Sequence, residues 1–122
     1  MNLYKNDKTS IDLVEQGGGL CLKFSGTIDQ ADPGEFMDPI LEKVHAQALE
    51  KKSRVDADFT SLSFLNSCGI KALIKWVMKL NTVPQPSRYA IKLLYSSKIT
   101  WQQSSLKAIT FLAKDIVTIE PV

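Results

Sequence analysis

The chain has few of the residues from which catalytic and metal centres are usually built. One histidine, His45, and two cysteines, Cys21 and Cys68, occur among 122 residues. The cysteines lack Cys-x-x-Cys spacing, which favours free thiols over a disulfide or a metal site. His45 has no second imidazole or thiolate near it in the sequence, so we expect it at the surface or its boundary and not as a general base. The sequence therefore predicts no enzyme, no metal and no cofactor.

Long apolar segments and an excess of one charge are also missing. No apolar stretch approaches the roughly 20 residues that span a bilayer, and the N-terminus Met1–Lys5 lacks the apolar centre of a signal peptide. The 15 Lys and Arg residues nearly balance the 13 Asp and Glu residues, and they form no run that would follow a phosphate backbone. We therefore expect a cytoplasmic protein that neither inserts into a membrane nor binds nucleic acid.

The length and the apolar content are those of one domain. A chain of 122 residues, 44% of them hydrophobic, can bury roughly two thirds of its unfolded surface. Alternating apolar residues predict strands at 11–13, 20–25, 54–59, 89–95 and 116–119. Apolar residues at three- and four-residue steps predict helices at 32–48, 67–80 and 104–113. The pattern thus predicts a single α/β domain over residues 1–122.

Two details of this pattern concern glycine and proline. Gly17-Gly18-Gly19 lies between two strand patterns and lacks the Gly-Lys-Ser/Thr of a phosphate loop, so it indicates a turn. Asp32-Pro33 and Asp38-Pro39 both resemble helix starts, with an acidic cap and a proline in the first turn. The first helix therefore has either a ragged start or a true start at Asp38.

The order of the elements predicts a layered fold. Strands separated by helices need crossover connections, which are right-handed in nearly all proteins. We expect a mixed sheet of about five strands with the helices packed mainly on one face. Trp76 and Trp101 are expected to pack against the domain itself. The expected core contains Phe59, Leu73, Ile74, Val77, Ile91 and Leu93.

The most informative segment is Asp58–Gly69, where a strand pattern ends in a polar triplet and an amphipathic helix begins. This switch places Ser67 at the start of the helix. Serine is a good N-cap, because its side-chain oxygen can accept a hydrogen bond from an unpaired amide of the first turn. The same position also suits a covalently added phosphate, since amide donors and positive dipole concentrate there.

The segment resembles a known family signature. Asp58–Gly69, followed by Ile70-Lys71-Ala72-Leu73, is similar to the signature of the STAS domain, the fold of anti-sigma-factor antagonists. Ser67 falls on the serine that a partner kinase phosphorylates in that family. Phe24–Asp29 more loosely resembles the family's Gly-x-Leu-Asp segment before its first helix. The family's usual Asp before the serine is Asn66 here, which keeps the size and the hydrogen-bonding capacity but removes a negative charge.

The resemblance implies a non-enzymatic regulatory module that binds a protein partner around Ser67 and the first half of the helix. The partner would be an anti-sigma-type serine kinase with the histidine-kinase-like ATPase fold, and a PP2C-type phosphatase would remove the phosphate. Asp58 would support the serine loop, either by accepting its backbone N–H groups or in the phosphoacceptor chemistry. The phosphoacceptor is Ser67, and the implied partner-binding residues are Asp58, Asn66, Ser67, Cys68, Gly69 and Lys71.

Two other functions stay open. Some STAS domains work without phosphorylation, as constitutive scaffolds or subunits of transport complexes, and Asn66 favours this alternative. A small enzyme or ligand-binding protein would need a polar pocket that converges on Asp58 or His45. Asp56 and Asp58 share one face of a strand, but two carboxylates without further ligands do not make a recognisable metal site.

Overall fold

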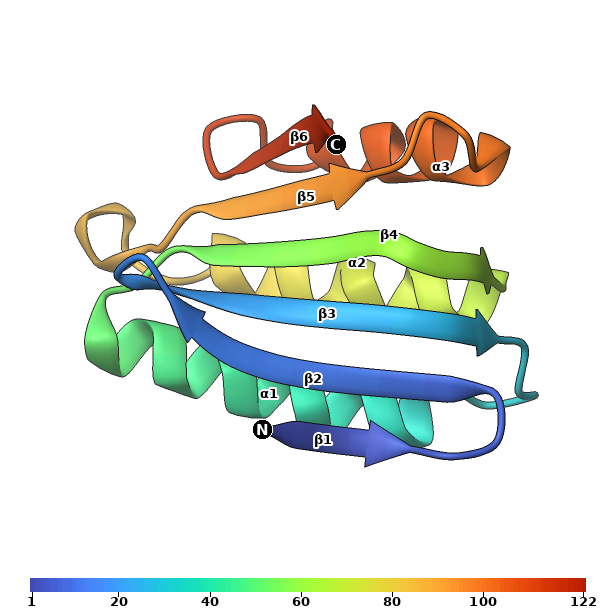
Figure 1. Ribbon diagram of the computed structural model, residues 1–122. Coiled ribbons are helices and arrows are strands. Elements are labelled where there is room, and N and C mark those ends of the chain that lie inside the picture. Colours follow the sequence, from blue (N-terminus) through green and yellow to red (C-terminus); the bar gives the residue numbers. More distant parts are fainter.

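The computed structural model describes residues 1–122 as a sheet with three helices (Figure 1). The helices are α1 Gly34–Lys51, α2 Ser67–Asn81 and α3 Thr100–Thr110, and a short 3-10 turn, η1 Gln85–Ser87, precedes the fifth strand. The strands are β1 Asn2–Lys5, β2 Thr9–Gln16, β3 Gly19–Ile28, β4 Val55–Leu65, β5 Ile91–Tyr95 and β6 Val117–Pro121. None of the helices is long and apolar enough to cross a membrane.

The six strands follow one another across the sheet in chain order. β1, β2 and β3 are antiparallel neighbours, whereas β4, β5 and β6 run parallel to β3. Each parallel connection steps to the next strand in the same direction, so right-handed crossovers place the three helices on one face. Figure 1 shows α1 and α2 behind the sheet, and α3 lies against β5 and β6. The predicted mixed sheet with helices mainly on one face is confirmed.

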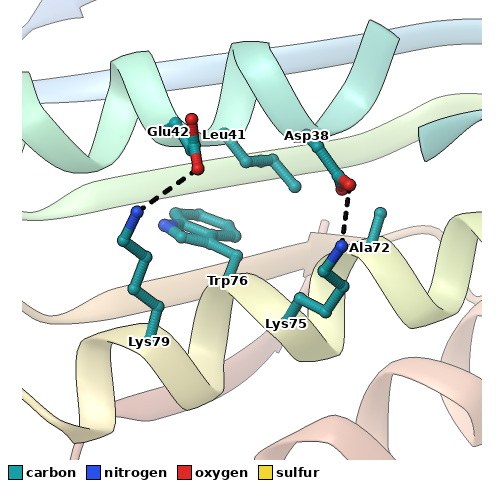
Figure 2. A pocket seen from close by; sticks show the side chains of 7 residues that line it. All are labelled: Asp38, Leu41, Glu42, Ala72, Lys75, Trp76 and Lys79. Atoms are coloured by element: carbon teal, nitrogen blue, oxygen red, sulfur yellow. Dashed lines mark hydrogen bonds and ion pairs between the residues drawn. The ribbon is translucent and has the colours of Figure 1, made fainter. Parts of the chain in front are cut away.

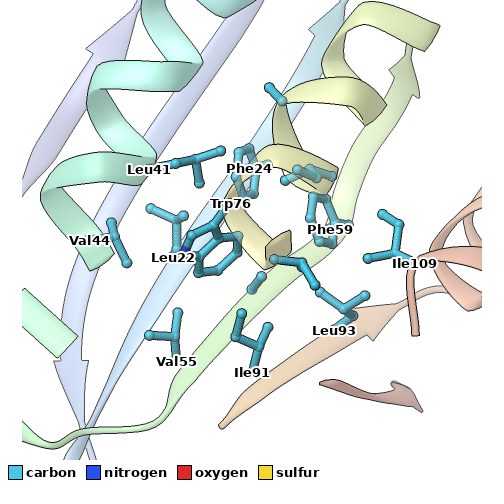
Figure 3. Packing of buried hydrophobic residues seen from close by; sticks show 14 of the residues in the cluster. Leu22, Phe24, Leu41, Val44, Val55, Phe59, Trp76, Ile91, Leu93 and Ile109 are labelled. Carbon is cyan, nitrogen blue, oxygen red and sulfur yellow. The ribbon is translucent and has the colours of Figure 1, made fainter. Parts of the chain in front are cut away.

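One cluster of 30 buried hydrophobic residues fills the space between the sheet and the helices. Figure 3 shows Leu41 of α1 close to Trp76 of α2, while Ile109 of α3 lies at the other side of the cluster, near Phe59 and Leu93. The stacked rings of Phe24 and Phe59, with centroids 4.7 Å apart, join β3 to β4 in this layer. Five of the six expected core residues belong to the cluster, while Ile74 is half-buried at its edge.

The opposite face of the sheet is polar and is covered by no helix. Asp12, Lys23 and Asp58 lie side by side on β2, β3 and β4. Lys92 of β5 forms an ion pair with Glu120 of β6 at 3.6 Å. Alternating charges on neighbouring strands attract each other and leave this face in water.

Several boundaries differ from those predicted by the pattern. β1 was not predicted, because this short edge strand is half exposed and shows no alternation. β4 continues to Leu65 and is longer than expected, whereas α3 runs from Thr100 to Thr110 and thus begins and ends earlier than the predicted 104–113. The start of α3 was missed because Ile99, its N-cap residue, makes no side-chain capping bond. Of the two possible starts of α1, the structure uses the first and keeps Pro39 inside the helix.

The glycine run forms the predicted turn. Gly17 and Gly18 have φ values of 57° and 78° and join β2 to β3. Two successive residues with positive φ match the twist of an antiparallel hairpin, a geometry that glycine adopts at no steric cost. The interpretation of this segment as a turn is therefore confirmed.

The surface position expected for His45 is wrong. The side chain is 6% exposed, and its Nδ1 lies 2.7 Å from the hydroxyl oxygen of Tyr89. Trp76, which packs inside the domain as predicted, donates its Nε1–H to the same oxygen at 2.8 Å. The Tyr89 hydroxyl accepts from Trp76 and still has a proton that it can donate to His45 Nδ1.

Burial lowers the pKa of His45, the charge of Lys79 lowers it further, and Glu42 opposes both effects. Burial also raises the pKa of Tyr89, so its hydroxyl stays protonated. The three side chains therefore form a neutral hydrogen-bonded unit that joins α1, α2 and the segment before β5.

Acidification is expected to destabilise the protein through His45. An unfolded histidine takes up its proton near pH 6.5, whereas folded His45 stays neutral to a lower pH. The unfolded state then binds more protons, so the free energy of unfolding falls as the pH drops below about 6.5. Urea denaturation at about pH 7.5 and about pH 5.5 measures the loss of stability. The same measurement on His45→Gln gives the part of the loss that comes from protonation of the carboxylates. An equal loss in both proteins would exclude His45 as the cause.

Candidate functional site

The candidate site is the junction between β4 and α2. Asn66 is the N-cap residue, with extended backbone angles (φ −75°, ψ 172°), and its Oδ1 accepts a hydrogen bond from Gly69 N–H at 2.9 Å. Ser67 is the first helical residue and its side chain is exposed. The predicted placement of Ser67 at the helix start, within reach of solvent, is confirmed. The capping bond, however, is made by Asn66 and not by Ser67.

Asn66 also makes a second bond that fixes the junction. Its Nδ2 donates to the backbone oxygen of Gln30 at 2.7 Å, which ties the start of α2 to the loop after β3. A carboxylate could cap the helix equally well but has no hydrogen to donate to Gln30. The amide therefore has a structural use here that the aspartate found in the STAS signature could not serve.

Gly69 allows α2 to pack closely on the end of β4. A Cβ atom at position 69 would lie 2.3 Å from Cδ1 of Leu65, which is itself buried. The neighbouring Cys68 is an exposed free thiol, and Lys71 is exposed one turn after Ser67. The structure thus brings Asn66, Ser67, Cys68, Gly69 and Lys71 together on one turn and a half of helix.

Asp58 does not lie with these residues. It stands in the middle of β4, seven residues before Leu65, which corresponds to roughly 20 Å of strand. Its Oδ1 accepts from the backbone N–H of Thr60 at 2.9 Å and from the hydroxyl of Thr60 at 2.6 Å. The expected support of the serine loop by Asp58 is replaced by two local hydrogen bonds within the strand.

The first turn of α3 supports the junction from the side, which the sequence did not predict. β5 pairs with β4 only as far as Asp58, so the second half of β4 has no strand on that side. Gln102, fully buried, donates to the backbone oxygens of Phe59 and Leu62, and its Oε1 accepts from Ser96 N–H at 2.7 Å. Trp101 donates its Nε1–H to the oxygen of Ser63 at 2.9 Å. Two side chains therefore take the place of a neighbouring strand.

A shallow groove lies between α1 and α2 (Figure 2). Its volume is about 120 Å³, and Leu41, Ala72 and Trp76 contribute its apolar lining. Two ion pairs cross it: Lys75–Asp38 at 2.8 Å and Lys79–Glu42 at 3.5 Å. Neither Asp58 nor His45 lines this groove, and no group of three or more His, Cys, Asp and Glu side chains is placed to hold a metal ion.

Comparison with known proteins identifies the fold. No protein-family model matches the chain, and no curated protein matches its sequence. A solved structure does match: the crystal structure of an anti-sigma factor antagonist from Mycobacterium paratuberculosis superposes with a TM-score of 0.63. The alignment covers 90% of this chain and 86% of that one, at 16% sequence identity.

The chain has the fold of an anti-sigma factor antagonist. The resemblance to the STAS domain that the segment Asp58–Gly69 suggested is thus confirmed in the fold. At 16% identity the likeness extends to the arrangement of strands and helices and not to individual functional residues. In this STAS-type fold β4 ends at Leu65 and α2 begins at Ser67, whose side chain is exposed (Figure 1).

Proposed function

We propose that this protein is a non-enzymatic regulatory module of the STAS type, which binds a protein partner through the face around Ser67. The observation that carries the proposal is the exposed Ser67 side chain at the first position of α2, next to a cap that Asn66 supplies. Because Ser67 makes no capping bond, its hydroxyl can be modified without loss of the cap. No acidic residue occupies the first turn of α2, so an added phosphate would meet no carboxylate there.

Phosphorylation of Ser67 is the proposed switch. A cytoplasmic partner, a serine kinase of the anti-sigma type, would transfer the γ-phosphoryl group of ATP to Ser67 Oγ, with ADP leaving and the hydroxyl proton released. A PP2C-type phosphatase would hydrolyse the Oγ–P bond with water and return the hydroxyl and inorganic phosphate. Phosphate adds about −1.5 to −2 charges at pH 7, which are costly to desolvate in a close interface. The modified form would therefore release its partner.

The expected result is that Ser67→Asp weakens partner binding at least about tenfold, whereas Ser67→Ala leaves it intact or strengthens it. The added charge, and not the loss of the hydroxyl, is what disrupts the interface. Calorimetry with the protein that co-purifies would measure both affinities, and mass spectrometry of the natively expressed protein would detect the phosphate on Ser67. Ser87→Asp is the matched control, because Ser87 is exposed in η1 at the opposite end of the sheet (Figure 1).

A constitutive scaffold is the alternative function, favoured by the bond from Asn66 to Gln30 that an aspartate could not make. A scaffold that never carries phosphate has no need of the negative charge found before the serine in the STAS signature. In that case Ser67→Asp and Ser67→Ala would both bind like the wild type, because Asn66 keeps the cap in both variants. Equal binding by the two variants would thus decide against the switch and keep the binding module.

A further inference from the structure

Ser67 heads a row of lysines along α2. Lys71, Lys75 and Lys79 follow it at four-residue steps, so the four side chains lie along one face of the helix. Lys75 and Lys79 pair with Asp38 and Glu42 of α1 across the groove (Figure 2). The hydrogen bond to Asp38 raises the pKa of Lys75. Two of the three lysines are therefore neutralised by α1.

Lys71 is exposed and takes part in none of the ion pairs of the structure. The register between the two helices explains why. Each pair joins residues 37 apart in the chain, which assigns Gly34 to Lys71 in the next step of the row. Gly34 has no side chain, and two carboxylates close to it, Asp32 and Asp38, are not paired with Lys71.

We propose that Lys71 is the counter-ion of phosphorylated Ser67, an inference that rests on the proposed function. The phosphate would give Lys71 the ion-pair partner that α1 does not supply at this step of the row. Side chains four residues apart on a helix are neighbours, and a negative group before a positive one is the favourable order. A phosphate also brings three acceptor oxygens for the Lys71 ammonium group. Lys71 is in this sense a positioning residue, which holds the phosphate along α2 on the partner-binding face.

The test uses the full chain with phosphoserine incorporated at position 67 during synthesis, so that it needs no kinase. The phosphate is titrated by phosphorus NMR at low salt in the parent, in Lys71→Gln and in Lys71→Arg. The second phosphate pKa lies near 6 in a free phosphoserine. We expect Lys71→Gln to raise it by about 0.2–0.4 pH unit, the size of one helical ion pair, and Lys71→Arg to restore the parent value. Lys107→Gln, an exposed lysine of α3 outside every ion pair, is the control.

An effect of Lys71→Gln no larger than that of Lys107→Gln would overturn the assignment. Failure of Lys71→Arg to restore the parent phosphate pKa would also overturn it, since the arginine puts the same positive charge at this position. The proposed function is tested separately by partner binding of the phosphoserine protein that keeps Lys71. If that protein binds as tightly as the unmodified one, the switch fails whatever the titration shows. If it releases the partner while Lys71→Gln leaves the phosphate pKa unchanged, only the proposed role of Lys71 fails.

Discussion

Truncation of Leu73 to alanine is expected to lower the free energy of unfolding by about 2–5 kcal/mol. Leu73 is 1% exposed and lies on the inward face of α2, within the main hydrophobic cluster. Removing its side chain loses apolar burial and leaves a cavity that the surrounding helices and strands fill only in part. Urea denaturation followed by circular dichroism measures the change.

Two variants calibrate this result. Ile74→Ala should cost less than Leu73→Ala, because Ile74 is only partly buried at the edge of the cluster. Lys107→Ala should cost under about 0.5 kcal/mol, as is usual for an exposed side chain. Lys107 takes part in no ion pair, so its truncation removes only an exposed side chain. Equal losses at positions 73 and 107 would show that the inward face of α2 has been assigned wrongly.

Replacement of Gln102 by methionine is expected to destabilise the protein by about 3 kcal/mol. Methionine fills a similar volume but cannot donate to the oxygens of Phe59 and Leu62 or accept from Ser96 N–H. Each backbone group left buried without a hydrogen-bond partner costs about 1–3 kcal/mol. Relaxation of the structure lowers the total for the three groups in part. Chemical denaturation gives the total.

The position next to Gln102 supplies a matched control. Gln103→Met makes the same change on the exposed side of α3 and should leave stability within about 0.5 kcal/mol of the wild type. Amide hydrogen exchange adds a local measurement, because β4 leads directly into the cap of α2. The amide of Gly69 should exchange faster in Gln102→Met than in Gln103→Met. Similar stability and exchange in the two variants would remove the proposed support of β4 by α3.

The sequence located the candidate site because its signals are local. The strand pattern before position 66 and the apolar steps after it leave only one place for the helix to start. Asn66 and Ser67 are both good capping residues, so the pattern could not decide which of the two makes the bond. That choice depends on Gln30, 36 residues away, whose backbone oxygen orients the amide of Asn66.

The features that were missed depend on contacts between distant parts of the chain. His45 bonds to Tyr89 across 44 residues, and Gln102 reaches Leu62 across 40. Glutamine is mostly exposed in proteins and histidine is intermediate, so neither residue type indicates a buried position by itself. The arrangement of the sheet could be predicted from the sequence, in contrast. The alternating apolar residues of β3, β4 and β5 show directly which face of each strand is buried.

The chain-order arrangement of the sheet has a consequence for synthesis on the ribosome. Every strand docks on the edge left by the strand before it, so no later segment has to insert between two that are already paired. The hairpin of β2 and β3 can form first from local contacts, and α1 with β4 can then extend it as they emerge. The junction at Asn66 and Ser67 is complete once α2 has been made, but Gln102 emerges later. A nascent chain that ends before α3 would therefore present Ser67 directly after a strand, β4, whose outer edge is still partly unpaired.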